Sequence, residues 1–79
     1  MLIHLQYYAI LREQSGRSTE SLDTTAATPT ALYAELKARY PFTLGEDQLK
    51  VAVNGEFRPW SQALKAGDAV VFIPPVAGG

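Results

Sequence analysis

Hydrophobic and polar side chains alternate along residues 2–10, near the start of the chain. Successive side chains of a β-strand point to opposite faces, so this alternation predicts a strand with one face in the core and the other in solvent. His4 and Gln6 mark the solvent face, on which Tyr8 also falls. The positions predicted for the core are Ile3, Leu5, Tyr7 and Ala9.

The next two elements have weaker signals. Residues 11–16 are expected to form a turn, because Gly16 tolerates the backbone conformations that turns require. Residues 18–22 are expected to form a second strand, at the edge of the sheet and paired with the first strand as a hairpin.

A helix is predicted to begin at Thr28-Pro29. The Thr28 hydroxyl can accept a hydrogen bond from a free backbone N–H group at the helix start, and Pro29 suits the first helical position, where no N–H group is needed. Apolar residues recur every four positions from Leu32 to Tyr40 and give the helix an apolar stripe. Pro41 ends the helix, because the residue before a proline disfavours the helical conformation.

The second half of the chain is expected to contain a hairpin. Asn54-Gly55 favours a two-residue turn with positive φ at both residues, between strands at 49–53 and 56–58. A short helical turn is expected afterwards, over residues 60–64.

The last strand is expected over residues 69–73, with Val70 and Phe72 on its core side and Val71 and Ile73 on the other. Two strands, a helix and further strands in this order predict an α+β domain, in which the helix packs on one face of a mixed sheet. The β-grasp fold fits this order, since its first and last strands lie side by side and parallel at the sheet centre. We expect four to five strands and one main helix.

Composition narrows the class of protein. A chain of 79 residues forms one domain, and 47% hydrophobic residues suffice for one thin core. Seven basic residues are scattered among eight acidic ones, which argues against a nucleic-acid partner.

The chain has no cysteine, so disulfides and thiolate metal sites are excluded. Without a signal peptide or an apolar run near the ~20 residues that span a bilayer, a cytoplasmic protein with no membrane partner is expected.

Side chains that could form a catalytic site are sparse. His4 is the single histidine, and it has no cysteine or second histidine with which to share a metal ion. Glu46 and Asp47 form a carboxylate pair, but a solvated loop is the simpler interpretation. No phosphate-binding loop is present. The sequence therefore predicts no metal site and no active site of the protein's own.

The C-terminal segment, residues 74–79, has the composition of a thin tail. Pro74 and Pro75 lack N–H groups and favour an extended conformation that leaves the sheet. Six extended residues reach about 20 Å, and the two final glycines can enter a channel too narrow for residues with side chains. We therefore expect a domain over residues 1–73 followed by a flexible tail.

The carboxylate of Gly79 is the candidate reactive group. Its reference pKa of about 3.3–3.7 makes it an anion at neutral pH and a poor electrophile. It becomes reactive only when another enzyme converts it into a mixed anhydride or a thioester. The alternative interpretation is a frayed, glycine-rich end without a function. Two glycines alone do not decide between this interpretation and a reactive terminal group.

Four segments resemble the MoaD family, the ubiquitin-like sulfur carriers that form the small subunit of molybdopterin synthase. The resemblance covers almost the whole chain, and the ending Phe-x-Pro-Pro-Val-x-Gly-Gly is its most specific part. The matching segments are residues 7–13, 51–54, 64–68 and 72–79. The resemblance implies a β-grasp fold and a tail whose terminal carboxyl group, that of Gly79, carries sulfur.

The resemblance also implies a cycle in which this chain is a non-catalytic subunit. An activating enzyme of the MoeB type uses ATP to adenylate the Gly79 carboxylate, and a sulfur donor protein converts the adenylate into a thiocarboxylate. The large synthase subunit, of the MoaE type, then transfers the sulfur to a pterin precursor in molybdenum cofactor biosynthesis. The chain itself binds no cofactor, and the synthase is expected to be a heterotetramer.

Contact residues follow from the same resemblance. The resemblance predicts an interface with the partners at Tyr8, Phe57, Ile73 and Arg12, with Arg12 near the activating enzyme. Strand alternation adds Val71, which falls on the same outer face as Ile73. The tail predicted to enter the active site of the large subunit consists of Pro74, Pro75, Val76, Ala77, Gly78 and Gly79. An exposed apolar patch of this kind would make the free protein prone to association.

Other functions stay open. Residues 53–56 and Trp60 also resemble the ThiS-type carriers of thiazole synthesis, although the chain length and Pro74-Pro75 favour the molybdopterin carriers. A ubiquitin-like modifier would be joined through Gly79 to lysines of other proteins. A plain binding module would work without its last residue.

Overall fold

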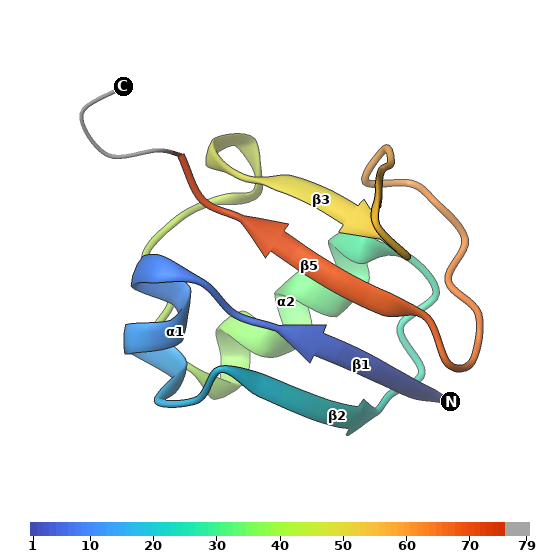
Figure 1. Ribbon diagram of the computed structural model, residues 1–79, viewed down its shortest axis with the longest axis horizontal. Coiled ribbons are helices and arrows are strands. Elements are labelled where there is room, and N and C mark those ends of the chain that lie inside the picture. Colours follow the sequence, from blue (N-terminus) through green and yellow to red (C-terminus); the bar gives the residue numbers. More distant parts are fainter. Residues whose placement is uncertain (76–79) are drawn as a thin grey trace.

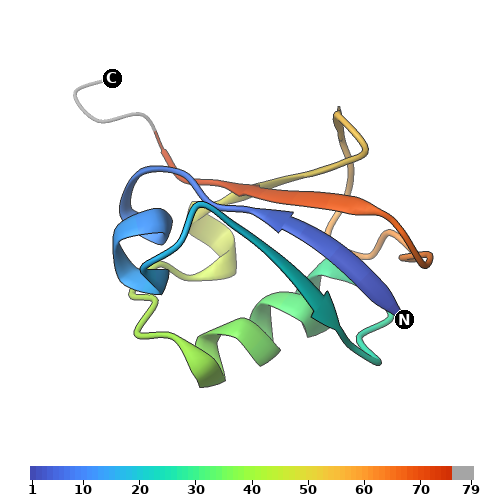
Figure 2. The same cartoon turned by 60° about the horizontal axis from the view of Figure 1, so that its bottom comes forward.

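The computed structural model describes residues 1–75 of the chain. Its elements, in chain order, are β1 (Leu2–Gln6), α1 (Ala9–Ser15), β2 (Thr19–Asp23), α2 (Pro29–Arg39), the 3₁₀ helix η1 (Glu46–Gln48), β3 (Lys50–Val53), β4 (Glu56–Phe57) and β5 (Ala69–Ile73). The strands form one sheet, and α2 runs beneath one of its faces (Figure 1 and Figure 2). The domain therefore has two layers.

The sheet has the strand order β2-β1-β5-β3-β4. The central strands β1 and β5 are parallel, with Leu5 opposite Val70, and the other neighbouring pairs are antiparallel. This pairing confirms the α+β class and the predicted β-grasp arrangement. The structure has five strands, with α2 as the main helix and α1 as a second, shorter one.

The core lies between the sheet and α2, and strand alternation decides which side chains enter it. Ile3, Leu5 and Tyr7 at the start of the chain are buried, as are Val70 and Phe72 of β5. The buried residues of α2 are Pro29, Leu32, Tyr33 and Leu36. The predicted core faces of the first and last strands are therefore confirmed, except at Ala9.

Helix α2 forms for local reasons that the sequence indicates. Thr28 is extended, with φ of −140°, and its hydroxyl oxygen accepts a hydrogen bond from the Ala31 N–H group at 3.3 Å. Pro29 occupies the first helical position. The helix ends at Arg39, and Tyr40, the residue before the proline, is extended. Within residues 1–75, no helix is long and apolar enough to cross a membrane.

The segment after β1 differs from its prediction. The turn predicted over residues 11–16 is wrong, because the chain forms α1 there. Ala9, predicted to face the core from a strand, is exposed and has a left-handed φ of 50°. Gly16 ends α1 with φ of 76°, and its N–H group donates to the Arg12 carbonyl oxygen at 3.0 Å. Complete burial of Leu11 stabilises this helix, whose start has no side-chain cap, and such a tertiary contact leaves little local signal.

The second hairpin is confirmed at its turn. Asn54 and Gly55 have φ values of 53° and 83°, both positive as a type I′ turn requires. The return strand β4 has two residues instead of the expected three. The helical turn predicted over residues 60–64 is wrong, since the segment contains a turn but no helix. Trp60 instead stacks on Phe72, with ring centroids 5.4 Å apart, and this tertiary contact outweighs the local preference.

A buried carboxylate links β2 to α2. Glu20, whose side chain is 5% exposed, accepts hydrogen bonds from the hydroxyl groups of Tyr7 at 2.8 Å and Tyr40 at 2.9 Å. The guanidinium groups of Arg17 and Arg39 lie 3.4 Å and 3.7 Å from it. Burial and the hydrogen bond to Glu20 raise the pKa of the Tyr7 hydroxyl above its usual value. Two donors and two cations thus compensate the buried charge.

Candidate functional site

The face of the sheet opposite α2 is covered by no helix within residues 1–75 (Figure 2). Residues paired across neighbouring strands share a face of the sheet. One such row runs from Gln6 on β1 through Val71 on β5 and Ala52 on β3 to Phe57 on β4. The row is polar at β1 and apolar from β5 to β4, so this outer face has an apolar half.

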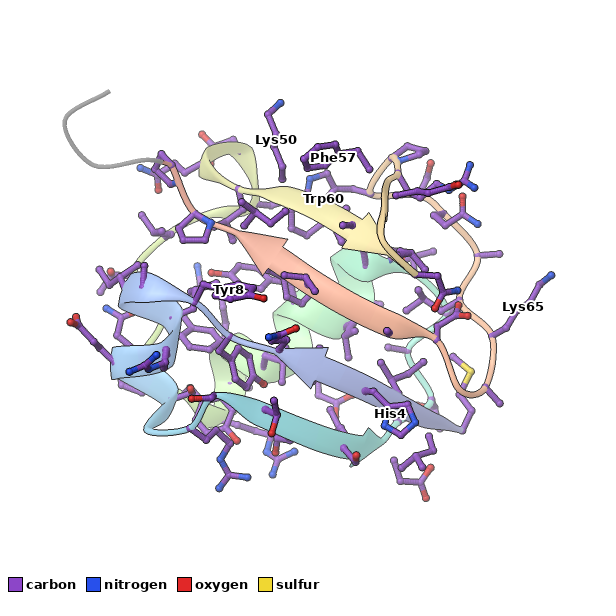
Figure 3. The ribbon with its side chains drawn as sticks, in the orientation of Figure 1. His4, Tyr8, Lys50, Phe57, Trp60 and Lys65 are labelled. Atoms are coloured by element: carbon purple, nitrogen blue, oxygen red, sulfur yellow. The ribbon has the colours of Figure 1, made fainter. Side chains whose placement is uncertain are left out.

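The apolar half contains a groove that reaches the start of the C-terminal segment. This outer groove has a volume of about 560 Å³ and is lined by Tyr8, Ala9, Ala52, Val71, Ile73, Pro74 and Pro75. Figure 3 looks onto this face and shows Tyr8 beside β5. A partner that fills the groove therefore also contacts the residues from which the C-terminal segment continues.

Exposure distinguishes this surface from the core. Phe57 and Tyr8 are the most exposed large hydrophobic residues of the described chain, at 70% and 47%. Val71 and Ile73 are half-buried. Contiguous exposed apolar side chains of this kind commonly mark an interaction site. The structure thus places four of the predicted interface residues on one face; their contacts with partners stay a prediction.

Arg12 lies apart from these residues. It belongs to α1, its side chain is exposed, and it does not line the outer groove. A partner seated in the groove need not contact it. Its expected contact with an activating enzyme stays a prediction.

The predicted tail is described only at its first two residues. Pro74 is half-buried and Pro75 is exposed, and both line the outer groove. Val76, Ala77, Gly78 and Gly79 lie outside the described residues. The domain boundary after residue 73 and the role of the Gly79 carboxylate therefore stay predictions.

A model of the ThiS family matches residues 5–79. The chain belongs to the ThiS family. It is similar to the molybdopterin synthase sulfur carrier subunit of Haemophilus influenzae, with 31% identity over 81 residues that cover 99% of this chain and 100% of the relative. The molybdopterin synthase sulfur carrier subunit of Escherichia coli is 34% identical over 83 residues, with the same coverage.

A solved structure supports the fold of this ThiS family member. SAMP1 of Haloferax volcanii, a small archaeal modifier protein, has a TM-score of 0.82 and 28% identity, and the match covers all of both chains. Together with the two sulfur carrier relatives, this similarity confirms the resemblance to MoaD-type carriers and the β-grasp fold.

Two residues of the outer groove were not among the predicted site residues. Ala52 is itself buried but lies between Val51 and Val53, which face the core, so strand alternation was a usable signal that it faces the other side of the sheet. Ala9 had no such signal, because its place in the groove depends on a left-handed φ that its sequence context does not indicate.

The outer groove can bind a partner but offers little chemistry of its own. The Tyr8 hydroxyl is the single titratable side-chain group among its lining residues. On the polar half of the face, Nδ1 of His4 lies 3.0 Å from Oγ of Ser21. Within residues 1–75, no group of three or more histidine, aspartate or glutamate side chains is placed to hold a metal ion. The described face fits binding and positioning of a partner.

The start of β5 is fixed by a polar clamp. The Asp68 carboxylate accepts hydrogen bonds from Nδ2 of Asn54 at 2.9 Å and from the Lys65 N–H group at 2.8 Å. These two bonds, that from Asn54 first, lower the pKa of the Asp68 carboxyl group. Oδ1 of Asn54 accepts a further bond from the Ala69 N–H group at 2.9 Å. The clamp joins the β3–β4 turn to the strand that leads to the tail.

Proposed function

We propose that this protein is the sulfur carrier subunit of a molybdopterin synthase and carries sulfur on the carboxyl group of Gly79. The full-length similarity to two molybdopterin synthase sulfur carrier subunits, at 31% and 34% identity, carries the proposal. The outer groove supports it, because the groove gives a partner an apolar surface that ends at Pro74 and Pro75.

The proposed cycle depends on the chemistry of other proteins. An adenylating enzyme consumes ATP and converts the Gly79 carboxylate, a poor electrophile, into a reactive acyl adenylate. Sulfide-level sulfur from a donor protein then attacks the acyl carbon, AMP leaves, and a thiocarboxylate remains. The thiocarboxylate donates its sulfur to a pterin precursor in the active site of the large synthase subunit. This chain needs no bound cofactor for its part.

The outer groove is the proposed docking surface for the large subunit. Tyr8, Val71 and Ile73 supply the apolar contact, and Phe57 extends it beyond Ala52. Residues 74–79 then enter the partner's active site. In the proposed heterotetramer, one copy of this chain docks at each end of a large-subunit dimer. Arg12, outside the groove, is proposed to contact the activating enzyme.

Intact-mass spectrometry tests the proposal. Full-length protein incubated with an activating enzyme, ATP and a sulfur donor is expected to gain about 16 Da, the difference between sulfur and oxygen at an activated acyl carbon. Deletion of Gly79 is the control, and it is expected to leave the fold intact while abolishing the mass shift and synthase activity. A wild-type protein without the shift, under conditions that modify a known sulfur carrier, contradicts the proposal.

The likeness to SAMP1 favours a second candidate function, a ubiquitin-like modifier joined through Gly79 to lysines. Denaturing gels of cell extracts distinguish the two candidates. A modifier forms a ladder of heavier conjugates that disappears when Gly79 is deleted. A sulfur carrier runs as a single band, which is the result that we expect.

A carrier for thiazole synthesis is distinguished by genetic rescue. The match to the ThiS family model covers both kinds of carrier, so the fold alone does not choose between them. Expressed in cells that lack their own molybdopterin synthase carrier, this protein is expected to restore molybdenum enzyme activity. Rescue of thiamine-requiring cells instead would reassign it to thiazole synthesis.

A further inference from the structure

A second hollow lies at the edge of the sheet formed by β3 and β4. This edge cleft has a volume of about 470 Å³ and is lined by Leu49, Lys50, Val51, Phe57, Arg58 and Trp60. Figure 3 shows Lys50, Phe57 and Trp60 gathered at this edge, far from Lys65. β4 pairs in register with only Ala52 and Val53 of β3, and the Arg58 N–H group then donates to the Val51 carbonyl oxygen at 3.1 Å. The start of β3 at Lys50 therefore has no neighbouring strand on this side.

Trp60 gives the edge cleft a fixed aromatic wall. Its ring stacks on Phe72, with centroids 5.4 Å apart and an interplanar angle of 19°, and meets Tyr33 edge-on at 5.9 Å. These contacts hold the indole in one orientation while part of it stays exposed. A preorganised aromatic surface binds apolar side chains without the entropic cost of ordering it first.

The rim of the edge cleft is cationic. The Arg58 guanidinium group is bound to the Glu56 carboxylate. Lys50 is exposed and forms no ion pair within residues 1–75. Asp47 lines a neighbouring hollow together with Lys50 but forms no ion pair with it within residues 1–75. An aromatic cleft beside an ammonium group without an ion-pair partner is complementary to a carboxylate on a segment that also presents an apolar side chain.

The edge cleft lies next to the outer groove, although no residue lines both. Phe57 belongs to the apolar half of the outer face and also lines the cleft. Lys50 pairs in register with Ile73 and lines a hollow next to Pro74 and Pro75. A protein that covers the outer groove therefore reaches the cleft without any rearrangement of this chain.

We infer that the edge cleft binds an acidic segment of the large subunit, with an aspartate or glutamate at Lys50 and an apolar side chain beside Phe57 and Trp60. The inference rests on the proposed docking of the large subunit to the outer groove. The acidic segment adds a charge-dependent contact to an otherwise apolar interface. Such a contact fixes the orientation of the partner and speeds association at low salt.

Lys50→Gln and Lys65→Gln test the inference as a matched pair. Both lysines are exposed and outside any ion pair of the described residues, and of the two only Lys50 lines the edge cleft. Affinity for the purified large subunit is measured at roughly 50 mM and 200 mM salt. Lys50→Gln is expected to weaken binding about threefold to tenfold at the lower salt and to flatten the salt dependence. Lys65→Gln is expected to change neither quantity.

Trp60 supplies a second readout, because it is the single tryptophan of the chain. Incorporated 5-fluorotryptophan gives one fluorine resonance, which is expected to shift when unlabelled large subunit binds. A resonance that does not move in a formed complex overturns the inference. Equal effects of Lys50→Gln and Lys65→Gln overturn it too, because they show a general dependence on charge.

Ile73→Asp separates this inference from the proposed function. If Ile73→Asp abolishes binding while Lys50→Gln has no effect, the docking proposal stands and the edge cleft has no acidic occupant. If the wild-type chain does not bind the large subunit at all, the docking proposal falls and this inference falls with it.

Discussion

The two faces of β5 differ in what covers them. Val70 and Phe72 point toward α2 and are fully buried, whereas Val71 and Ile73 alternate with them in sequence and remain half-buried on the outer face. All four side chains are hydrophobic, so composition does not distinguish the faces. The inner face is covered by the chain's own helix, and the outer face is proposed to be covered by another protein. One strand can therefore serve stability and binding through separate residues.

Phe72→Ala is expected to have the largest effect, and it acts on the inner face. The Phe72 ring centroid lies 5.1 Å from that of Tyr33 and 5.4 Å from that of Trp60. Truncation leaves a cavity and lowers the free energy of unfolding by about 3–5 kcal/mol. Urea titration followed by circular dichroism measures this loss. Val71→Ala on the outer face is expected to cost less than about 1.5 kcal/mol, and equal losses would contradict the division between the faces.

Ile73→Asp, on the outer face, is expected to weaken binding of the large subunit strongly and to leave the domain folded. A carboxylate in the outer groove stays hydrated in the free protein but loses its water when an apolar partner docks. Affinity for the large subunit should fall by about 30-fold or more, equivalent to about 2 kcal/mol, while cooperative unfolding is retained. Titration calorimetry measures the affinity, and Ile73→Val, which keeps the apolar contact, is the control. An unfolded Ile73→Asp variant would show that residue 73 faces the core.

The division between the faces was largely predictable from the sequence. Alternation assigned Tyr7 and Phe72 to the core and Tyr8 and Ile73 to the outside, because strand geometry fixes the direction of each side chain from its neighbours. The start of α2 was predictable for a similar reason, since Thr28 caps the helix through a local hydrogen bond. Interactions between residues close in sequence leave a readable pattern.

Features made by residues distant in sequence were not predictable in the same way. Helix α1 depends on the burial of Leu11, and the path of the chain near Trp60 depends on stacking against Phe72. The outer groove was predictable in its principal residues but not in its shape, which requires the left-handed Ala9. The edge cleft requires β4 to end at Phe57, one residue before the end that Pro59 indicates.

The two ends of α1 allow a finer test of whether stability and binding are separate. Both end residues have positive φ, and the test replaces alanine by glycine at residue 9 and glycine by alanine at residue 16. Ala9 has φ of 50° and lines the outer groove, whereas Gly16 has φ of 76° and open space around it. Ala9→Gly relieves about 1 kcal/mol of backbone strain, partly offset by the greater freedom of glycine in the unfolded chain. We expect a net gain of about 0.5 kcal/mol in unfolding free energy for Ala9→Gly and a loss of similar size for Gly16→Ala.

The measurement for this pair combines thermal unfolding with binding. Gly16→Ala lies outside the outer groove, so its affinity for the large subunit should match that of the wild type. Ala9→Gly removes a methyl group from the groove and loosens the backbone next to Tyr8, so its affinity should fall slightly although its stability rises. Stability and affinity that move together at residue 9 would argue against separate roles for the two faces.

Asp68 belongs to neither face, and the expected effect of replacing it is no larger than the effects at residues 9 and 16. Hydrogen bonds from Asn54 and Lys65 lower its pKa in the folded state below the usual 3.8. Folding therefore favours the ionised carboxylate. The stability that the carboxylate contributes is complete above the unfolded pKa and is lost as the pH falls through the folded pKa.

Asp68→Asn should be less stable than the wild type by about 0.5 kcal/mol near neutral pH. The difference should be smaller at an acidic pH below the folded pKa, where the wild-type carboxyl group is uncharged like the asparagine. Urea titrations at the two pH values measure the difference, and a constant gap would show that the clamp depends on shape and not on charge. Binding of the large subunit at neutral pH should be unchanged, since the clamp lies outside both the outer groove and the edge cleft.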